Sequence, residues 1–395
     1  MEDDQDRELG RLLRKVAPKP DPGFFTRLTA LLSQHASKRR MHGKWRLGRK
    51  RNAAFAGVAM ALIAVVLAGL LDNGSSGPSV RAQQNAAPPR GSDLAAVVFV
   101  DALHGWAVGD SGNIVATQDG GATWRAQTST TTQRLAGVAF VDKLRGWVVG
   151  DFGTILATTD GGATWHEQFP QAGTRVQLVA VAFPDSLHGW AVGGSTRGVL
   201  LSTSDGGVSW NTQHLGTPQY LNGVSFPDPL SGWIIGDFGT LFETSDGGTV
   251  WREQNLALAS TTQQNPSLQR LVDSTCVRFV DSSHGWVVGD FGSVQATTDG
   301  GVTWQVQDST TDKALLSASF TDTSYGWAVG DSGTIVATTN GGATWYRQLS
   351  GTTKDLHGVW FTDRTRGWAV GEGGIILATT DGGASWILQR GTASK

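Results

Sequence analysis

The sequence predicts an all-β fold, a seven-bladed β-propeller built from four-stranded blades. Seven copies of a Phe-x-Asp-x-x-x-Gly-Trp pattern run from about residue 94 to about residue 390, each followed by an Asp-Gly-Gly-x-x-Trp box that begins with Asn in the sixth copy. Successive Gly-Trp motifs lie 41, 43, 43, 53, 41 and 41 residues apart, which is the length of one propeller blade. The Gly-Trp tryptophans are Trp106, Trp147, Trp190, Trp233, Trp286, Trp327 and Trp368.

Each repeat contains four strand signals, A to D, separated by turn sequences. In the second copy they cover residues 135–140, 147–150, 154–159 and 164–168. The Gly-Asp and Asp-Gly pairs between them are typical of tight hairpins, because glycine accepts positive φ. Since strand direction alternates, the A–B and C–D turns share one face of the disc, here named the box face. The B–C turns and the more variable D–A connections share the other, named the loop face.

The chain ahead of the repeats predicts a membrane anchor. Residues 1–51 hold fourteen Lys or Arg and six Asp or Glu, and an uncharged apolar run ends at residue 71. About twenty apolar residues span about 30 Å as a helix, one hydrocarbon core, and the basic side stays cytoplasmic. We therefore expect a single-pass protein of the cytoplasmic (inner) membrane with its N-terminus inside and an extracytoplasmic propeller.

This topology divides the chain into a basic cytoplasmic arm at 1–51, a transmembrane signal anchor at 52–71, a linker at 72–92 and the propeller at 93–395. Apolar residues at helical spacing predict two short amphipathic helices in the arm. A cleaved signal peptide and a buried core helix are the alternatives for the apolar run. About fifty residues ahead of it are too many for the n-region of a signal peptide.

The repeated residues are interpreted as architecture. The phenylalanines and both tryptophan sets recur at equivalent positions, so adjacent blades must bury them against each other. A short acceptor side chain at the start of each box closes the turn onto backbone N–H groups. Asparagine serves as well as aspartate in the sixth copy, which a catalytic carboxylate would not allow. The box residues are Asp119, Asp160, Asp205, Asp246, Asp299, Asn340 and Asp381.

Departures from the repeat are the candidate partner-binding residues. Arg278 and Trp360 replace small residues on the innermost strand, and Arg175, Arg197 and Arg270 fall in or beside variable connections. Arginine clusters bind peptide carboxylates, and binding commonly uses variable loops on a rigid scaffold. We expect the partner on the loop face, which also carries the longest D–A connection, at 255–274.

Composition and motifs argue against several function classes. The single cysteine, Cys276, excludes an internal disulfide framework and any multi-cysteine metal site. The sequence has no phosphate loop, no Ser-His-Asp signature and no metal-ligand spacing. We therefore expect no catalytic residues, no cofactor, no metal and no nucleic-acid partner, and the sequence identifies no small-molecule substrate.

The repeat units, as in residues 140–168 and 320–348, resemble the photosystem II stability/assembly factor family across about 300 residues. The resemblance implies a seven-bladed propeller that binds assembly intermediates of a photosynthetic membrane complex. We expect a non-catalytic, membrane-anchored protein-binding scaffold or assembly factor for a membrane or exported complex. The alternative is a transmembrane sensor or regulator with a ligand-binding propeller. A sialidase-like Asp-box glycoside hydrolase is the third, but the sequence lacks the Arg-Ile-Pro signature of sialidases.

Overall fold

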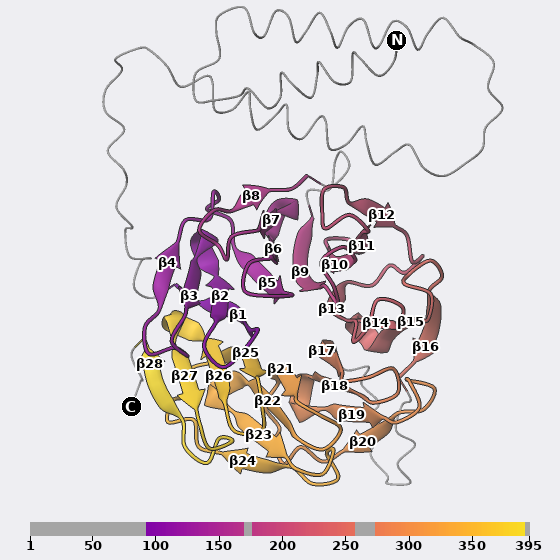
Figure 1. Cartoon of the computed structure of the whole chain (residues 1–395). Helices are drawn as coiled ribbons and strands as arrows, with labels where there is room; N and C mark the ends of the chain where they lie inside the picture. Colours follow the sequence, from indigo (N-terminus) through magenta and orange to yellow (C-terminus); the bar gives the residue numbers. More distant parts are fainter. Residues whose placement is uncertain (1–91, 170–175, 257–272, 392–395) are drawn as a thin grey trace, which may run out of the picture. The chain divides into compact units, whose positions relative to one another are not determined.

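The predicted seven-bladed propeller is confirmed. A computed structural model describes residues 92–169, 176–256 and 273–391. In these residues seven four-stranded antiparallel sheets, each made of consecutive strands, are arranged as a ring (Figure 1). The predicted cytoplasmic arm, signal anchor and linker lie outside the described residues. Within the described part of the chain, no helix has the length and apolar character needed to cross a membrane.

The four strands of a blade lie in order from the ring centre to its rim (Figure 1). The inner strands, A, are β1 (Leu94–Phe99), β5 (Leu135–Phe140), β9 (Gln177–Ala182), β13 (Leu221–Ser225), β17 (Ser274–Phe279), β21 (Leu315–Phe320) and β25 (Leu356–Phe361). The B strands are β2 (Gly105–Gly109), β6 (Gly146–Gly150), β10 (Gly189–Gly194), β14 (Gly232–Gly236), β18 (Gly285–Gly289), β22 (Gly326–Gly330) and β26 (Gly367–Gly371).

The two outer strands of each blade are short. The C strands are β3 (Ile114–Thr117), β7 (Ile155–Thr158), β11 (Gly198–Thr203), β15 (Thr240–Thr244), β19 (Val294–Thr297), β23 (Ile335–Thr338) and β27 (Ile376–Thr379). The D strands are β4 (Arg125–Gln127), β8 (His166–Glu167), β12 (Asn211–Gln213), β16 (Arg252–Asn255), β20 (Gln305–Gln307), β24 (Tyr346–Gln348) and β28 (Ile387–Arg390).

Six of the B–C turns contain a single turn of 3₁₀ helix. These are η1 (Asp110–Gly112), η2 (Asp151–Gly153), η3 (Asp237–Gly239), η5 (Asp290–Gly292), η6 (Asp331–Gly333) and η7 (Glu372–Gly374). Hydrogen bonds place the turns on the two expected faces. Gly161 N, in the box, donates to Leu144 O in the A–B turn, and Asp151 N, in the B–C turn, donates to Arg134 O just before β5.

Aromatic rings hold neighbouring blades together. Trp147 of the second blade stacks on Phe183 of the third, with ring centroids 3.6 Å apart. Phe183 meets the box tryptophan of its own blade, Trp210, edge-on at 5.9 Å. The glycine before each Gly-Trp tryptophan is required by this packing, because a Cβ on Gly189 would collide with the ring of Phe183. Burying each large ring removes about 150–250 Å² from water, so the repeated aromatic residues make up much of the core.

The ring closes without exchange of a strand between its first and last blades. Blade 7 contains only β25–β28 and blade 1 only β1–β4. Trp368 stacks on Phe99 with centroids 3.5 Å apart and donates its Nε1 hydrogen to Gly120 O at 3.1 Å. Closure therefore depends on the same side-chain contacts that join the other blades.

Candidate functional site

The Asp boxes are closed turns whose carboxylates are bonded within the turn. In the second blade, Asp160 Oδ1 accepts the Thr158 hydroxyl at 2.8 Å and Thr164 N at 2.9 Å, and Oδ2 accepts the Thr164 hydroxyl at 2.6 Å. The Thr164 hydroxyl is the main reason why the pKa of Asp160 is lowered to about 2. Asn340 makes the equivalent bonds to Thr344 and Thr338. A group held ionised in this way is unsuited to donate a proton as a general acid.

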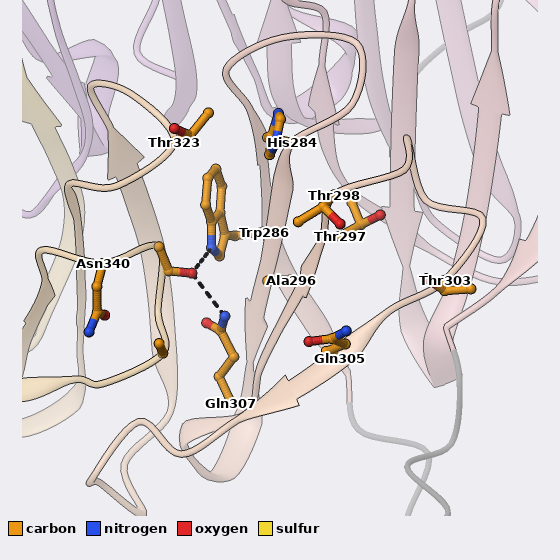
Figure 2. Close-up of a pocket in the computed structure, with 12 residues that line it drawn as sticks. His284, Trp286, Ala296, Thr297, Thr298, Thr303, Gln305, Gln307, Thr323 and Asn340 are labelled. Carbon is orange, nitrogen blue, oxygen red and sulfur yellow. Dashed lines mark hydrogen bonds between the residues drawn. The ribbon is translucent and has the colours of Figure 1, made fainter.

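A cavity of about 350 Å³ between blades 5 and 6 shows how the boxes join the blades (Figure 2). In its lining, Gly341 O accepts Trp286 Nε1 at 3.1 Å and Gln307 Nε2 at 2.9 Å, the two bonds drawn as dashed lines in Figure 2. Gln307 Oε1 in turn accepts Trp345 Nε1 at 3.1 Å. These bonds link blade 5 to blade 6, so we attribute the cavity to the packing of neighbouring blades.

The hydrogen bonds that join the tryptophans, the D-strand glutamine and the box glycine of neighbouring blades are incomplete at two blade boundaries. Gln213 Nε2 donates to Ser202 Oγ at 3.0 Å, and among the described residues the buried Trp190 Nε1 has no hydrogen-bond partner. Gln254 Nε2 donates to Glu243 Oε2 at 2.8 Å, and Trp304 Nε1 likewise has no described partner. Both breaks lie at a boundary of the fourth blade, and the diverted glutamines belong to the outer strands of the third and fourth blades.

Two of the predicted partner-binding residues come together at the ring centre. The Arg278 guanidinium carbon lies 4.7 Å from the ring centroid of Trp360, two blades away. Arg278 Nε also donates to Ala318 O of the blade between them, at 3.2 Å. Both side chains line a cavity of about 200 Å³ with Ser319 and Phe320. Arg278 is the penultimate residue of β17, next to the A–B turn, so this cavity lies at the box-face end of the inner strands.

Arg197, the third predicted partner-binding residue that the structure describes, lies apart from Arg278 and Trp360. Arg197 is exposed in the turn between β10 and β11, on the loop face. Arg175 and Arg270 lie outside the described residues, as does most of the long connection at 255–274. A partner surface with Arg175, Arg197 and Arg270 on the loop face stays a prediction, whereas Arg278 and Trp360 lie toward the opposite end of the inner strands.

Cys276 does not have the environment of a nucleophile. Its side chain packs against the hydrophobic core at the boundary between blades 5 and 6. Burial raises the pKa of the Cys276 thiol, which keeps it protonated at neutral pH.

Comparison with known proteins identifies the family. The model of the photosynthesis system II assembly factor YCF48 family matches residues 84–168, 208–272 and 304–390. The chain belongs to this family. No curated protein sequence gives a significant match.

Solved YCF48 structures share the fold. One is YCF48 bound to a D1 peptide, 19% identical, with a TM-score of 0.60, covering 74% of this chain and 93% of that chain. Another is YCF48 from Cyanidioschyzon merolae, 21% identical, with a TM-score of 0.59, covering 74% of this chain and 97% of that chain. A xyloglucanase of glycoside hydrolase family 74 from Xanthomonas campestris is 13% identical with a TM-score of 0.59. The comparison covers 76% of this chain and 55% of the xyloglucanase.

Three B–C turns carry exposed phenylalanines that the sequence analysis did not single out as candidate binding residues. Phe152, Phe238 and Phe291 are 66%, 53% and 63% exposed, in turns whose other copies have serine or glycine. The available sequence signal is the Gly-Asp-Phe-Gly turn itself, which places a large apolar residue between two glycines at a solvent-facing hairpin.

Proposed function

We propose that this protein is a non-catalytic assembly or stability factor that binds a protein segment of a membrane or exported complex. The observation that carries the proposal is the YCF48 family match, which extends over stretches from the first blade to the last. A solved YCF48 holds a D1 peptide, which supports a protein partner. The non-catalytic role is supported by box carboxylates that are bonded within their turns.

The Arg278–Trp360 cavity is the part of the described surface best suited to take a partner side chain. A guanidinium is a planar donor that pairs with carboxylates and carbonyl oxygens, and a tryptophan ring packs on apolar groups. The other blades place Val98, Ala139, Ala182, Ser225 or Ser319 at this position. The arginine and the tryptophan are therefore not needed to build an inner strand.

Crosslinking with mass spectrometry on the native complex tests the proposal, because it identifies the partner and the face together. We expect crosslinks to a membrane or exported protein from residues beside Arg278 and Trp360. The variant Arg278→Ser, which restores the residue of the neighbouring blade, should weaken partner capture at least about tenfold, the range of a lost charged contact. Arg197→Ser is the matched control on the loop face. Capture that is unchanged by Arg278→Ser but lost in Arg197→Ser would place the partner on the other face.

The proposed membrane location has its own test. Residues 52–71 would hold the chain in the cytoplasmic membrane with the propeller outside. Protease added to intact spheroplasts should then degrade the repeats and spare residues 1–50. Protection of the repeats with loss of the arm would invert the proposed topology.

A transmembrane sensor is the second candidate, and the predicted amphipathic helices of the arm support it. The predicted topology would put the basic arm across the membrane from the propeller, where it would report partner binding. Deletion of residues 1–45 discriminates the two functions if the anchored propeller is still made at its normal level. Full complementation of a null mutant supports scaffolding alone, and failure to complement supports signalling through the arm.

A further inference from the structure

We propose a second docking surface on the loop face of blades 4 and 5, built around Phe238 and Phe291, for a cationic amphipathic protein segment. Such a segment carries Lys or Arg beside large apolar side chains. This surface lies toward the opposite end of the inner strands from the Arg278–Trp360 cavity and does not depend on the function proposed for that cavity.

The two phenylalanines are not explained by folding. Phe238 and Phe291 are 53% and 63% exposed and have φ angles of 56° and 55°. This left-handed region disfavours bulky side chains. Ser111 and Ser332 occupy the same position in other blades with φ angles of 58° and 56°, so serine builds the same turn. Large apolar side chains held in solvent on disfavoured backbone indicate selection for a contact outside the ring.

Four carboxylates lie on the same face of blades 4 to 6 as the phenylalanine pair. Asp237 and Asp290 precede Phe238 and Phe291, Asp273 Oδ1 accepts Phe238 N at 3.1 Å, and Asp331 lies on the next B–C turn. Burial, followed by the charges of Asp273, Asp331 and Asp237, raises the pKa of Asp290, so Asp290 lies within electrostatic range of the other three carboxylates. In the residues that the structure describes, none of the four forms an ion pair with a Lys or Arg side chain.

The arrangement fits a polypeptide better than a metal ion. Within the described part of the chain, no three acidic, histidine or cysteine side chains are placed to hold a metal. Negative charge spread over three turns suits positive charges spread along a chain, and the exposed rings supply apolar area for its side chains. The chain also enters the ring on this face, because Asp93 Oδ1 accepts Gly373 N of the B–C turn of blade 7 at 2.7 Å.

The segment is assigned to a partner and not to the basic arm of the same chain. Residues 1–51 carry a net positive charge, but the predicted anchor places them across the membrane from the propeller. The arm is retained as an alternative occupant that the experiment separates.

The test measures binding of a labelled twelve-residue peptide of Lys and Leu to the full chain in nonionic detergent by fluorescence anisotropy. Peptides in which Glu replaces Lys, or Ser replaces Leu, are the ligand controls. The double variant Phe238→Ser/Phe291→Ser should lose at least about tenfold in affinity, since it removes both large apolar side chains that the peptide would bury. Asp290→Asn should weaken binding at low salt and flatten its salt dependence.

The matched control is Leu103→Ser/Leu144→Ser, which removes two exposed apolar residues, 51% and 57% accessible, from the A–B turns of the box face. It should leave peptide affinity unchanged. Because serine occupies the Phe position in other blades, the phenylalanine variant should keep the melting temperature of the parent. Equal binding of the Glu peptide, or unchanged affinity in the phenylalanine variant, would overturn the proposal. A rise in affinity after deletion of residues 1–45 would also overturn it, by showing that the arm occupies the surface.

Discussion

Two buried tryptophans at the same repeat position should differ in how much stability they lose when replaced by phenylalanine. Trp147 and Trp190 are 3% and 2% exposed, and each stacks on the phenylalanine of the next blade with centroids 3.6 Å apart. Trp147 Nε1 donates to Gly206 O at 2.9 Å, whereas the buried Trp190 Nε1 has no partner among the described residues. The two substitutions therefore remove similar packing, but Trp147→Phe removes a hydrogen-bonded donor and Trp190→Phe removes an unpaired one.

The hydrogen-bond terms set the expected difference. Trp147→Phe loses a made hydrogen bond, worth about 0.5–1.5 kcal/mol. Trp190→Phe removes an unpaired buried donor, whose desolvation costs the folded state about 1–3 kcal/mol. Since the lost ring area is similar, Trp147→Phe should be more destabilising by about 1.5–4.5 kcal/mol.

Urea unfolding of the full chain, followed by far-ultraviolet circular dichroism, measures the difference without relying on the substituted tryptophan. A second pair tests the same reasoning at the box position, because Trp345 Nε1 donates to Gln307 at 3.1 Å while Trp304 Nε1 has no described partner. Equal losses of unfolding free energy in Trp147→Phe and Trp190→Phe, within about 0.5 kcal/mol, would refute the assignment of unpaired donors.

Two further predictions concern the second Asp box. Asp160→Asn should unfold near the parent midpoint in urea, because Asn340 closes the sixth box with equivalent bonds. Asp160→Ala should unfold at a lower urea concentration. Similar losses of stability in both variants would show that the charge itself is needed. The folded pKa of Asp160 is about 2, below its ordinary value of 3.8, so its ionised form stabilises the fold above about pH 4 and that stability is lost as the pH falls toward 2. Melting temperatures between pH 5 and 2 should therefore fall less steeply in Asp160→Asn than in the parent, and parallel curves would contradict this.

The repeat was enough to predict the blade count, the strand order and the two faces. In the second copy, the strands predicted at 135–140 and 147–150 are observed as Leu135–Phe140 and Gly146–Gly150. These features depend on residues close in sequence, since alternation, glycine turns and box acceptors act within one repeat of about forty residues. The Asp-to-Asn exchange in the sixth box likewise indicated a turn-closing role, and the bonds of Asn340 are those that a turn requires.

The predicted arm, anchor and membrane location lie beyond what the described residues test. They rest on hydropathy and charge in the first 92 residues, and the shaving experiment addresses them directly.

Only the tertiary structure decided what meets across blade boundaries. Arg278 and Trp360 lie 82 positions apart in sequence and form a pair because two blades turn their inner strands toward the same centre. The repeat pattern also does not predict the unpaired donor of Trp190 or the exposure of Phe238. Other copies have a tryptophan at the position of Trp190 and a similar turn at the position of Phe238. The physical reason is that curvature and closure of the ring set the distances between blades. Hydrogen-bond pairing and solvent exposure depend on those distances, whereas local sequence specifies each blade by itself.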